Sequence, residues 1–230
     1  MIIEKKELVN LFYILHKMNI GDLTANHASI LSKKKDGFYM NKHKFLFSQI
    51  NYNNLNFVKL NDDFNKKHKE INKAGFYIHK YLHQSVARPK AILHTHSINS
   101  VAISVLKNGF NEKLNQSSMR FYKRVKYFDY NGMVMNQKEG QKLQKLVDKN
   151  TKLIVLKNHG LIILANTIAE LFHLTFHFEK CAQIQLKLNN NNNLTKVSNR
   201  ISAITCKQHE SFGEVGKMSW KAIKKEYKLI

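Results

Sequence analysis

The sequence feature that most constrains the fold is a pair of short apolar segments that both carry histidine. Residues 90–96, KAILHTH, predict a buried strand. Residues 151–165, TKLIVLKNHGLIILA, predict two strands that meet at a tight turn through Asn158, His159 and Gly160. Imidazole is an unusual side chain for a strand interior, so the histidines in these segments point to a special role.

Helical patterns alternate with the predicted strands. Residues 1–18 have apolar side chains at helical spacing. Residues 72–87 begin at a cap, Asn72, and stop before Pro89, and a capping box at Thr167 opens a helix through residue 188. Shorter segments predict helices at 97–106 and 138–150, strands at 37–47 and 56–64, and strand or loop at 126–135. At 230 residues, this mixture predicts one layered domain of the α/β or α+β class.

The net charge of +22 raises the question of nucleic-acid binding, but the pattern of charge does not support it. Only four of the basic residues are arginines, and the lysines are scattered along the chain. Helix-turn-helix, RNP and zinc-finger patterns are missing. Lys, Asn and Ile share AT-rich codons, so genome composition explains much of the excess. We predict no specific nucleic-acid partner, only weak and salt-sensitive adhesion to polyanions.

The sequence also indicates a compartment. The first residues are charged and lack the pattern of a signal peptide, and no stretch reaches the ~18 apolar residues that a membrane span needs. Cys181 and Cys206 are the only cysteines, and their spacing is not that of a metal pair. We therefore predict a cytoplasmic protein that has no membrane partner.

The two histidines of the first segment project together, because residues i and i+2 share one face of a strand. His94 and His96 lie at the end of the predicted strand, and His159 in the glycine turn is a suitable third ligand. Catalytic zinc commonly has three protein ligands and one open position. The alternative interpretation is a pair of hydrogen-bonded histidines at a strand end.

Longer phrases around these histidines resemble the class II aldolase/adducin family. The phrases are RPKAILHTHSINSVAIS and LKNHGLIILANTIAELFHLTFHFEKCAQIQ, and NKAGFYIH and SSMRFYKRVKYFDYNGM are similar to the adducin-like bacterial branch. The resemblance covers about residues 7–188. It implies a three-layer α/β/α domain over residues 1–188 with a central mixed or antiparallel sheet. Residues 189–230 would then be an asparagine-rich loop, 189–193, and a C-terminal extension packed on or tailing the same domain.

The resemblance also implies a function. His94, His96 and His159 would bind one Zn²⁺ per subunit of a homo-oligomer, which is commonly a tetramer in the family. The expected activity is a class II aldolase-type lyase reaction on a small hydroxy-carbonyl compound, a sugar or sugar phosphate, through a metal-stabilised enediolate. The alternative is a catalytically degenerate adducin-like binding domain that retains the fold.

The sequence departs from the family at the general acid/base. The glutamate of the sugar-phosphate aldolases falls at Gly75, which has no side chain. His79 lies one turn further along the same helix and is a candidate proton shuttle. Its alternative interpretation is a hydrogen-bonded histidine at the edge of the core. Glu70, before the helix, is a further candidate.

The substrate pocket is also only partly retained. The family's Gly-Asn-x-Ser phrase corresponds to residues 26–29, where only Ser29 matches, and Ser29 is our candidate for substrate binding. Other positions with open assignments are Lys44 and Lys73 near the family's phosphate contacts, and Tyr122, Tyr127 and Tyr130 as candidates for a tyrosine donated to a neighbouring subunit. We interpret His173 and His177 as residues on the flank of the long helix, although their spacing could hold a metal.

Overall fold

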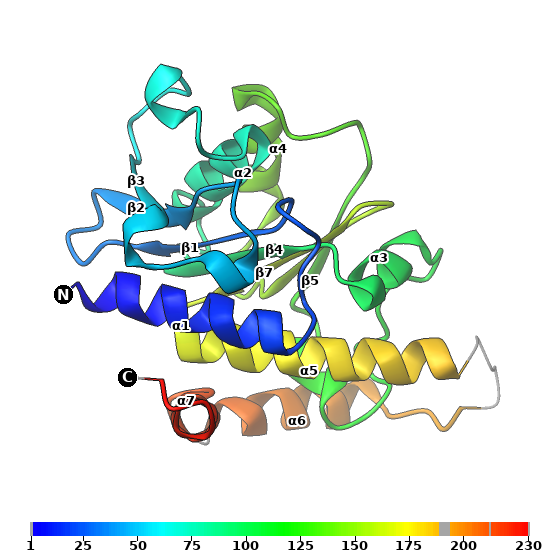
Figure 1. The fold of residues 1–230 in the computed structure, drawn as a ribbon. Coiled ribbons are helices and arrows are strands. Elements are labelled where there is room, and N and C mark those ends of the chain that lie inside the picture. Colours follow the sequence, from blue (N-terminus) through cyan, green and yellow to red (C-terminus); the bar gives the residue numbers. More distant parts are fainter. Residues whose placement is uncertain (1, 189–193, 212, 230) are drawn as a thin grey trace.

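The segments predicted as strands lie together in one mixed sheet (Figure 1). The computed structural model describes residues 2–188, 194–211 and 213–229. Within them the sheet has seven strands in the order β3-β2-β1-β4-β7-β6-β5. The strands are β1 His27–Leu31, β2 Gly37–Asn41, β3 Leu55–Lys59, β4 Ala91–Thr95, β5 Val125–Phe128, β6 Leu153–Leu156 and β7 Gly160–Ala165. Only the β5–β6 pair is parallel.

Helices cover both faces of this sheet (Figure 1). They are α1 Ile3–Lys17, α2 Lys73–His83, α3 Ile98–Val105, α4 Gln137–Leu146, α5 Ile168–Lys187, α6 Asn199–Ser211 and α7 Lys217–Glu226. The side chains of α2 and α4 form one apolar cluster with β4, β6 and β7. A larger cluster joins α1 and α5 to the opposite face. The prediction of a three-layer α/β/α domain with a mixed sheet is confirmed.

The central strands are apolar because both of their faces are covered. Every residue of β4, β6 and β7 is buried. Such strands lack the alternation of a half-exposed strand, as the continuous apolar segments indicated. The end of β4 is therefore fixed on both sides, by β1 and by β7.

Two predicted helix starts have the expected geometry. The Asn72 side chain accepts a hydrogen bond from the Gly75 N–H at 3.0 Å, and Thr167 accepts one from Glu170 at 3.0 Å. The helix predicted over 72–87 ends earlier, at His83. Beyond it, the Ser85 N–H donates to the Leu82 carbonyl at 3.1 Å and the Arg88 N–H donates to the Ser85 carbonyl at 3.0 Å.

The predicted strand over 37–47 is shorter in the structure and ends at Asn41. Beyond it, the backbone N–H of His43 donates to the carbonyl of Glu70 rather than to a neighbouring strand. The lysines on either side of His43 bind the same carboxylate: Lys42 and Lys44 lie 2.7 and 2.5 Å from the oxygens of Glu70. These contacts turn the chain out of the sheet.

The C-terminal helices lie on the outside of α5, away from the sheet (Figure 1). Trp220 of α7 is 4% exposed, and its ring centroid is 5.5 Å from that of Phe172 on α5. Its indole N–H donates to Glu7 of α1, and Lys224 pairs with the same carboxylate at 2.7 Å. The predicted loop 189–193 lies outside the described residues.

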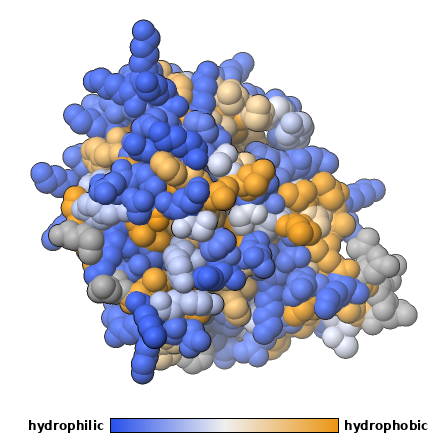
Figure 2. All heavy atoms as spheres, in the orientation of Figure 1, coloured by the Kyte–Doolittle hydropathy of each residue, from blue (hydrophilic) through white to orange (hydrophobic). Residues whose placement is uncertain are grey.

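The face of the molecule seen in Figure 2 is mostly hydrophilic, with apolar patches between hydrophilic residues. A search of the described helices finds none that combines the length and the apolar character required to cross a membrane.

Candidate metal centre

Two loops at one end of the central strands bring the three predicted histidines together. His94 lies near the end of β4, His96 follows β4, and His159 occupies the turn between β6 and β7. Pairing of β4 with β7 places His94 opposite Ile162 and Thr95 opposite Leu161, so the turn lies beside His96. Their convergence therefore follows from the register of the sheet.

Glycine at position 160 permits this close approach. A Cβ on Gly160 would lie 2.5 Å from the carbonyl oxygen of Thr95 and 3.0 Å from Cδ2 of His96. These separations are too short for a side chain, so only glycine lets the turn lie against the end of β4.

The Nε2 atoms of the three rings point to one place. His96 Nε2 lies 2.8 Å from His94 Nε2 and 2.9 Å from His159 Nε2. The three residues form a group able to hold a metal ion. Two imidazoles on one tetrahedral zinc ion keep their nitrogens about 3.3 Å apart at the usual bond length, so a small ring movement is enough to admit the ion.

The other nitrogens of two of these rings show why the Nε2 atoms need a cation between them. The Nδ1–H of His94 donates to the Leu161 carbonyl at 2.8 Å, and that of His96 donates to Asp22 Oδ2 at 3.0 Å. In the neutral rings the Nε2 atoms of His94 and His96 therefore both carry lone pairs and face each other. A positive ion resolves this repulsion, and the carboxylate–histidine pair is a usual support for a metal ligand.

Burial keeps the imidazoles of His94 and His159 neutral, as metal binding requires. Burial, followed by repulsion from His27, His96 and His159, holds the pKa of His94 well below its usual value. Burial and then His96 lower the pKa of His159 to about 4. At neutral pH both side chains therefore have a lone pair free for a ligand bond.

Asn26 supports the site and has a spare donor. Its side-chain oxygen accepts the backbone N–H of His96 at 2.9 Å. Its Nδ2 atom is buried and has no hydrogen-bond partner among the described residues. A buried donor without a partner is costly, so this amide is suited to an oxygen atom of a ligand.

The histidine predicted as a proton shuttle belongs to a buried chain of polar groups. His83 Nδ1–H donates to the Pro89 carbonyl at 2.8 Å, and His83 Nε2 lies 2.8 Å from Ser29 Oγ. Ser29 Oγ lies 2.5 Å from His79 Nδ1, and His79 Nε2 lies 2.8 Å from His27 Nδ1.

The Pro89 carbonyl can only accept, which fixes the direction of every bond in this chain when the rings are neutral. Ser29 donates to His83, His79 donates to Ser29, and His27 donates to His79. His27 is left with a lone pair on Nε2. Burial is the main cause that lowers the pKa of both His27 and His79. The chain therefore holds a neutral imidazole nitrogen with a lone pair in the interior.

The Nε2 atom of His27 lies beside Gly75, the position at which the resemblance predicts a glutamate. A Cβ on Gly75 would be 2.9 Å from this nitrogen, and the ring centroid of His27 is 4.8 Å from that of His94. Ser29, our predicted substrate contact, is fully buried, with its hydroxyl engaged by two histidines. Its contact with a substrate stays a prediction.

The other candidates lie elsewhere. Glu70 is held by Lys42 and Lys44, whose hydrogen bonds lower its pKa to about 2. Tyr122 is buried, and the Tyr127 hydroxyl accepts the Phe110 N–H at 3.1 Å. Tyr130 is 56% exposed. His173 and His177 lie half-buried on α5.

Three residues near the site were missed by sequence reasoning: Asp22, Asn26 and His27. They lie far from the three predicted ligands in sequence. The pairing of β1 with β4, which puts His27 opposite His94, brings this part of the chain to the metal centre. The alternating character of residues 27–31 was the available signal for that strand, but it does not name the partner strand.

Comparisons with known proteins agree with these features. A family described as class II aldolase and adducin N-terminal domain matches residues 6–186. The chain is 28% identical to human gamma-adducin over 187 residues, which are 79% of this chain and 26% of that protein. It is 30% identical to an adducin-related protein of Schizosaccharomyces pombe over 70% of this chain and 51% of the relative. The chain thus spans a quarter to a half of these relatives.

Solved structures share the fold. An aldolase II superfamily protein from Pseudomonas syringae aligns with a TM-score of 0.85 at 24% identity, over 97% of this chain and 91% of that one. An L-fuculose 1-phosphate aldolase from Glaciozyma antarctica aligns with a TM-score of 0.77 at 22% identity, over 96% and 88% of the two chains.

Proposed function

Because this chain belongs to the class II aldolase and adducin family, we propose that it is a zinc-dependent lyase for a small hydroxy-carbonyl compound. The substrate class is a sugar or sugar phosphate. The observation that carries this proposal is the meeting of three Nε2 atoms, from His94, His96 and His159, at one point. The Nε2 atoms of His94 and His96 carry lone pairs that face each other there. The three histidines would hold one zinc ion per subunit.

When bound, zinc supplies Lewis-acid stabilisation of the negative charge that develops on the oxygens of an enediolate. The chain supplies the rest. Asp22 and the Leu161 carbonyl fix the orientation of His96 and His94. The free amide N–H of Asn26 is available to hold a substrate oxygen beside them.

The proton carrier is the part of the site at which this sequence departs from the pattern that the resemblance implies. Gly75 has no side chain, so a carboxylate at that position is excluded. The chain of His27, His79 and Ser29 instead offers an imidazole nitrogen with a lone pair beside Gly75. We keep His79 as the candidate shuttle, with His27 as its contact on the side of the metal centre.

A second candidate function is supported by the same glycine. An adducin-like binding domain would retain the fold and the histidines but would not catalyse a reaction. The imidazole of His27 fills the space that an acid/base side chain at position 75 would need. The adducin relatives fit this alternative.

Three further properties belong to the proposal. We expect a homo-oligomer, by resemblance a tetramer, and the exposed ring of Tyr130 is available to a neighbouring subunit. The partner is a small molecule. A cytoplasmic location is supported by two buried cysteines that form no disulfide.

The proposal is tested by metal content and turnover together. Elemental analysis of freshly purified protein should find zinc, and a panel of ketose phosphates and unphosphorylated ketoses should include a compound that is cleaved. His94→Ala should abolish cleavage. Zinc without turnover of any compound would favour the binding domain, and a protein that ignores added zinc would exclude the enzyme.

A further inference from the structure

A second polar site lies beside α5, where the side chain of Arg120 is buried without a carboxylate partner. Arg120 belongs to the short 3₁₀ helix Ser118–Phe121 and is 7% exposed. Its guanidinium donates to the Ser117 carbonyl at 2.9 Å and to His173 Nε2 at 2.7 Å. In the described part of the chain it forms no ion pair with a carboxylate, whereas Arg124 pairs with Glu210 at 2.7 Å. A buried charge usually needs a counter-charge.

The guanidinium lines a cavity of about 270 Å³. His173 of α5 and His209 of α6 line it as well, and the segment 214–219 closes it. The one carboxylate among the lining residues is Glu214, which pairs with Lys217 at 2.7 Å. The cavity therefore keeps a net positive character from Arg120.

The start of α7 opens into the same cavity. Gly216 precedes the helix with φ of 79° and provides no side-chain cap. The N–H groups of Met218 and Ser219, in the first turn, have no acceptor among the described residues. Free N–H groups and the helix dipole attract anions. A Cβ on Gly216 would lie 2.7 Å from Cβ of His173, so glycine is needed to bring this helix start to the histidine.

The two histidines of the cavity add no charge to it at neutral pH, so its positive charge comes from Arg120. Burial, then Arg120 and His209, lower the pKa of His173 to about 4. The pKa of His209 is also lowered, mainly by burial, and its Nε2–H donates to the Gln116 carbonyl at 2.8 Å. The neutral ring of His173 accepts a hydrogen bond from Arg120 and leaves the charge of the guanidinium without a counter-charge.

We propose that this cavity binds a phosphate group. A phosphate oxyanion accepts hydrogen bonds from several directions, which suits the planar fork of Arg120 together with the N–H groups of α7. This site is separate from the metal centre, because α5 and α7 rather than the strand ends form it.

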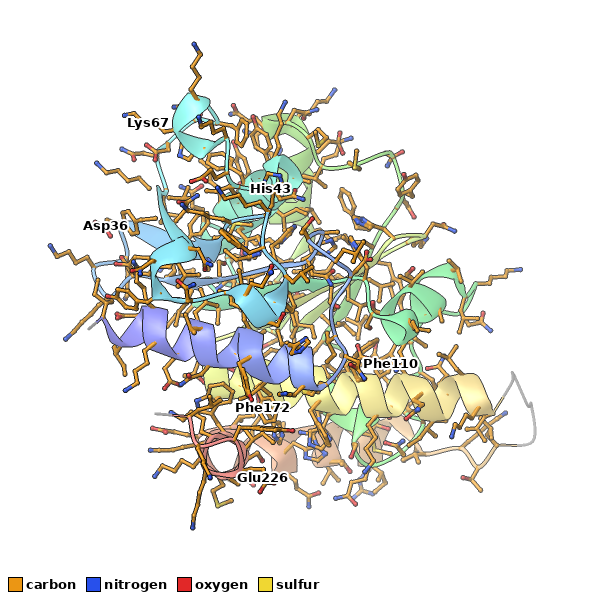
Figure 3. All side chains as sticks on the ribbon, in the orientation of Figure 1. Asp36, His43, Lys67, Phe110, Phe172 and Glu226 are labelled. Carbon is orange, nitrogen blue, oxygen red and sulfur yellow. The ribbon has the colours of Figure 1, made fainter. Side chains whose placement is uncertain are left out.

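A groove beside the cavity provides space for the organic group of a phosphate monoester. The proposed ligand is therefore either free phosphate or such an ester. A hollow of about 460 Å³ between α5 and α7 shares His173 and Ser219 with the cavity. Figure 3 labels two of its lining residues, Phe172 on α5 and Glu226 on α7. The aromatic rings of Phe172 and Phe176 would receive the organic part of the ester.

The test measures thermal unfolding of the full-length protein with inorganic phosphate, with phenyl phosphate, or with sodium chloride at equal ionic strength. At a concentration about tenfold above the Kd, either phosphate should raise Tm by about 3–5 °C. Arg120→Met should lose this shift. Arg200→Met removes the same charge from an exposed position of α6 and should retain it.

A second variant distinguishes the loss of phosphate binding from a folding defect. Ser219→Glu places a carboxylate in the first turn of α7, where it favours the helix but repels an anion. It should lose the phosphate shift without a lower Tm in chloride. A larger shift with phenyl phosphate would identify the ester as the ligand, and equal shifts would identify free phosphate. The proposal is overturned if neither compound shifts Tm, or if Arg120→Met and Ser219→Glu respond as Arg200→Met does.

Discussion

The imidazole of His27 lies in the space that a side chain at position 75 would occupy. A Cβ on Gly75 would be 2.9 Å from both Nε2 and Cδ2 of this ring, and 2.5 Å from the terminal methyl group of Met40. Methionine is flexible enough to move, but the hydrogen bond to His79 holds the His27 ring. The glycine at position 75 and the histidine of β1 therefore depend on each other.

This dependence predicts a measurable coupling. Gly75→Ala should lower the free energy of unfolding by about 1–3 kcal/mol, because the clash exceeds the usual helix gain from alanine. In a His27→Ala background the same change should cost less. A double-mutant cycle from urea unfolding measures the difference. Additive effects would show that the two residues do not compete for space.

Loss of a metal ligand should remove the metal. We expect about one zinc ion per chain in the parent protein and nearly none in His94→Ala or His159→Ala, because two imidazoles hold zinc far less firmly than three. Elemental analysis checks this. His16→Ala, at an exposed histidine on α1, is the matched control and should keep its zinc. Equal zinc in all four proteins would place the metal elsewhere.

The carboxylate behind His96 should tune metal affinity. Asp22→Asn removes the charge that orients the ring at 3.0 Å and should weaken zinc binding about 10- to 100-fold. Competition with a coloured chelator measures the affinity. Asp129→Asn, at a side chain paired with Lys157 on the surface, should leave it unchanged. If both variants bind zinc like the parent, Asp22 has no role in metal binding.

Acid should destabilise the metal-free fold through its buried histidines. Burial lowers the pKa of His83 to about 4, although the Pro89 carbonyl opposes the shift. The unfolded chain then binds more protons than the folded one below pH 6.5, so stability is complete above that pH and falls towards pH 4. His83→Gln should reduce this slope by up to about 1.4 kcal/mol per pH unit, and His16→Gln should not. Urea unfolding of chelator-treated protein across this range tests the prediction, and an unchanged slope in His83→Gln would contradict it.

The C-terminal extension should contribute to the stability of the domain. Trp220→Ala removes a buried ring and its hydrogen bond to Glu7, and should cost about 3–5 kcal/mol. Met218→Ala, at a side chain that is 79% exposed, is the control. Urea unfolding is followed by circular dichroism, because Trp220→Ala removes the one tryptophan of the sequence and its fluorescence. Both variants should show one transition. A loss well below 1 kcal/mol in Trp220→Ala would mean that residues 189–230 only tail the domain.

Several parts of this protein follow from local sequence alone. The capped starts of α2 and α5 depend on hydrogen bonds between residues three apart. The buried strands follow from continuous apolar segments, and spacing together with family resemblance named His94, His96 and His159. Each of these signals lies within a few residues or within a recognisable phrase.

Only the tertiary structure decided what surrounds those histidines. His27 reaches the centre because β1 pairs with β4, and Asp22 reaches His96 across 74 positions. The positive cavity at Arg120 arises where the 3₁₀ helix Ser118–Phe121, α5, α6 and the start of α7 meet. Strand partners and helix docking depend on packing between distant segments, and no periodicity within one segment records them.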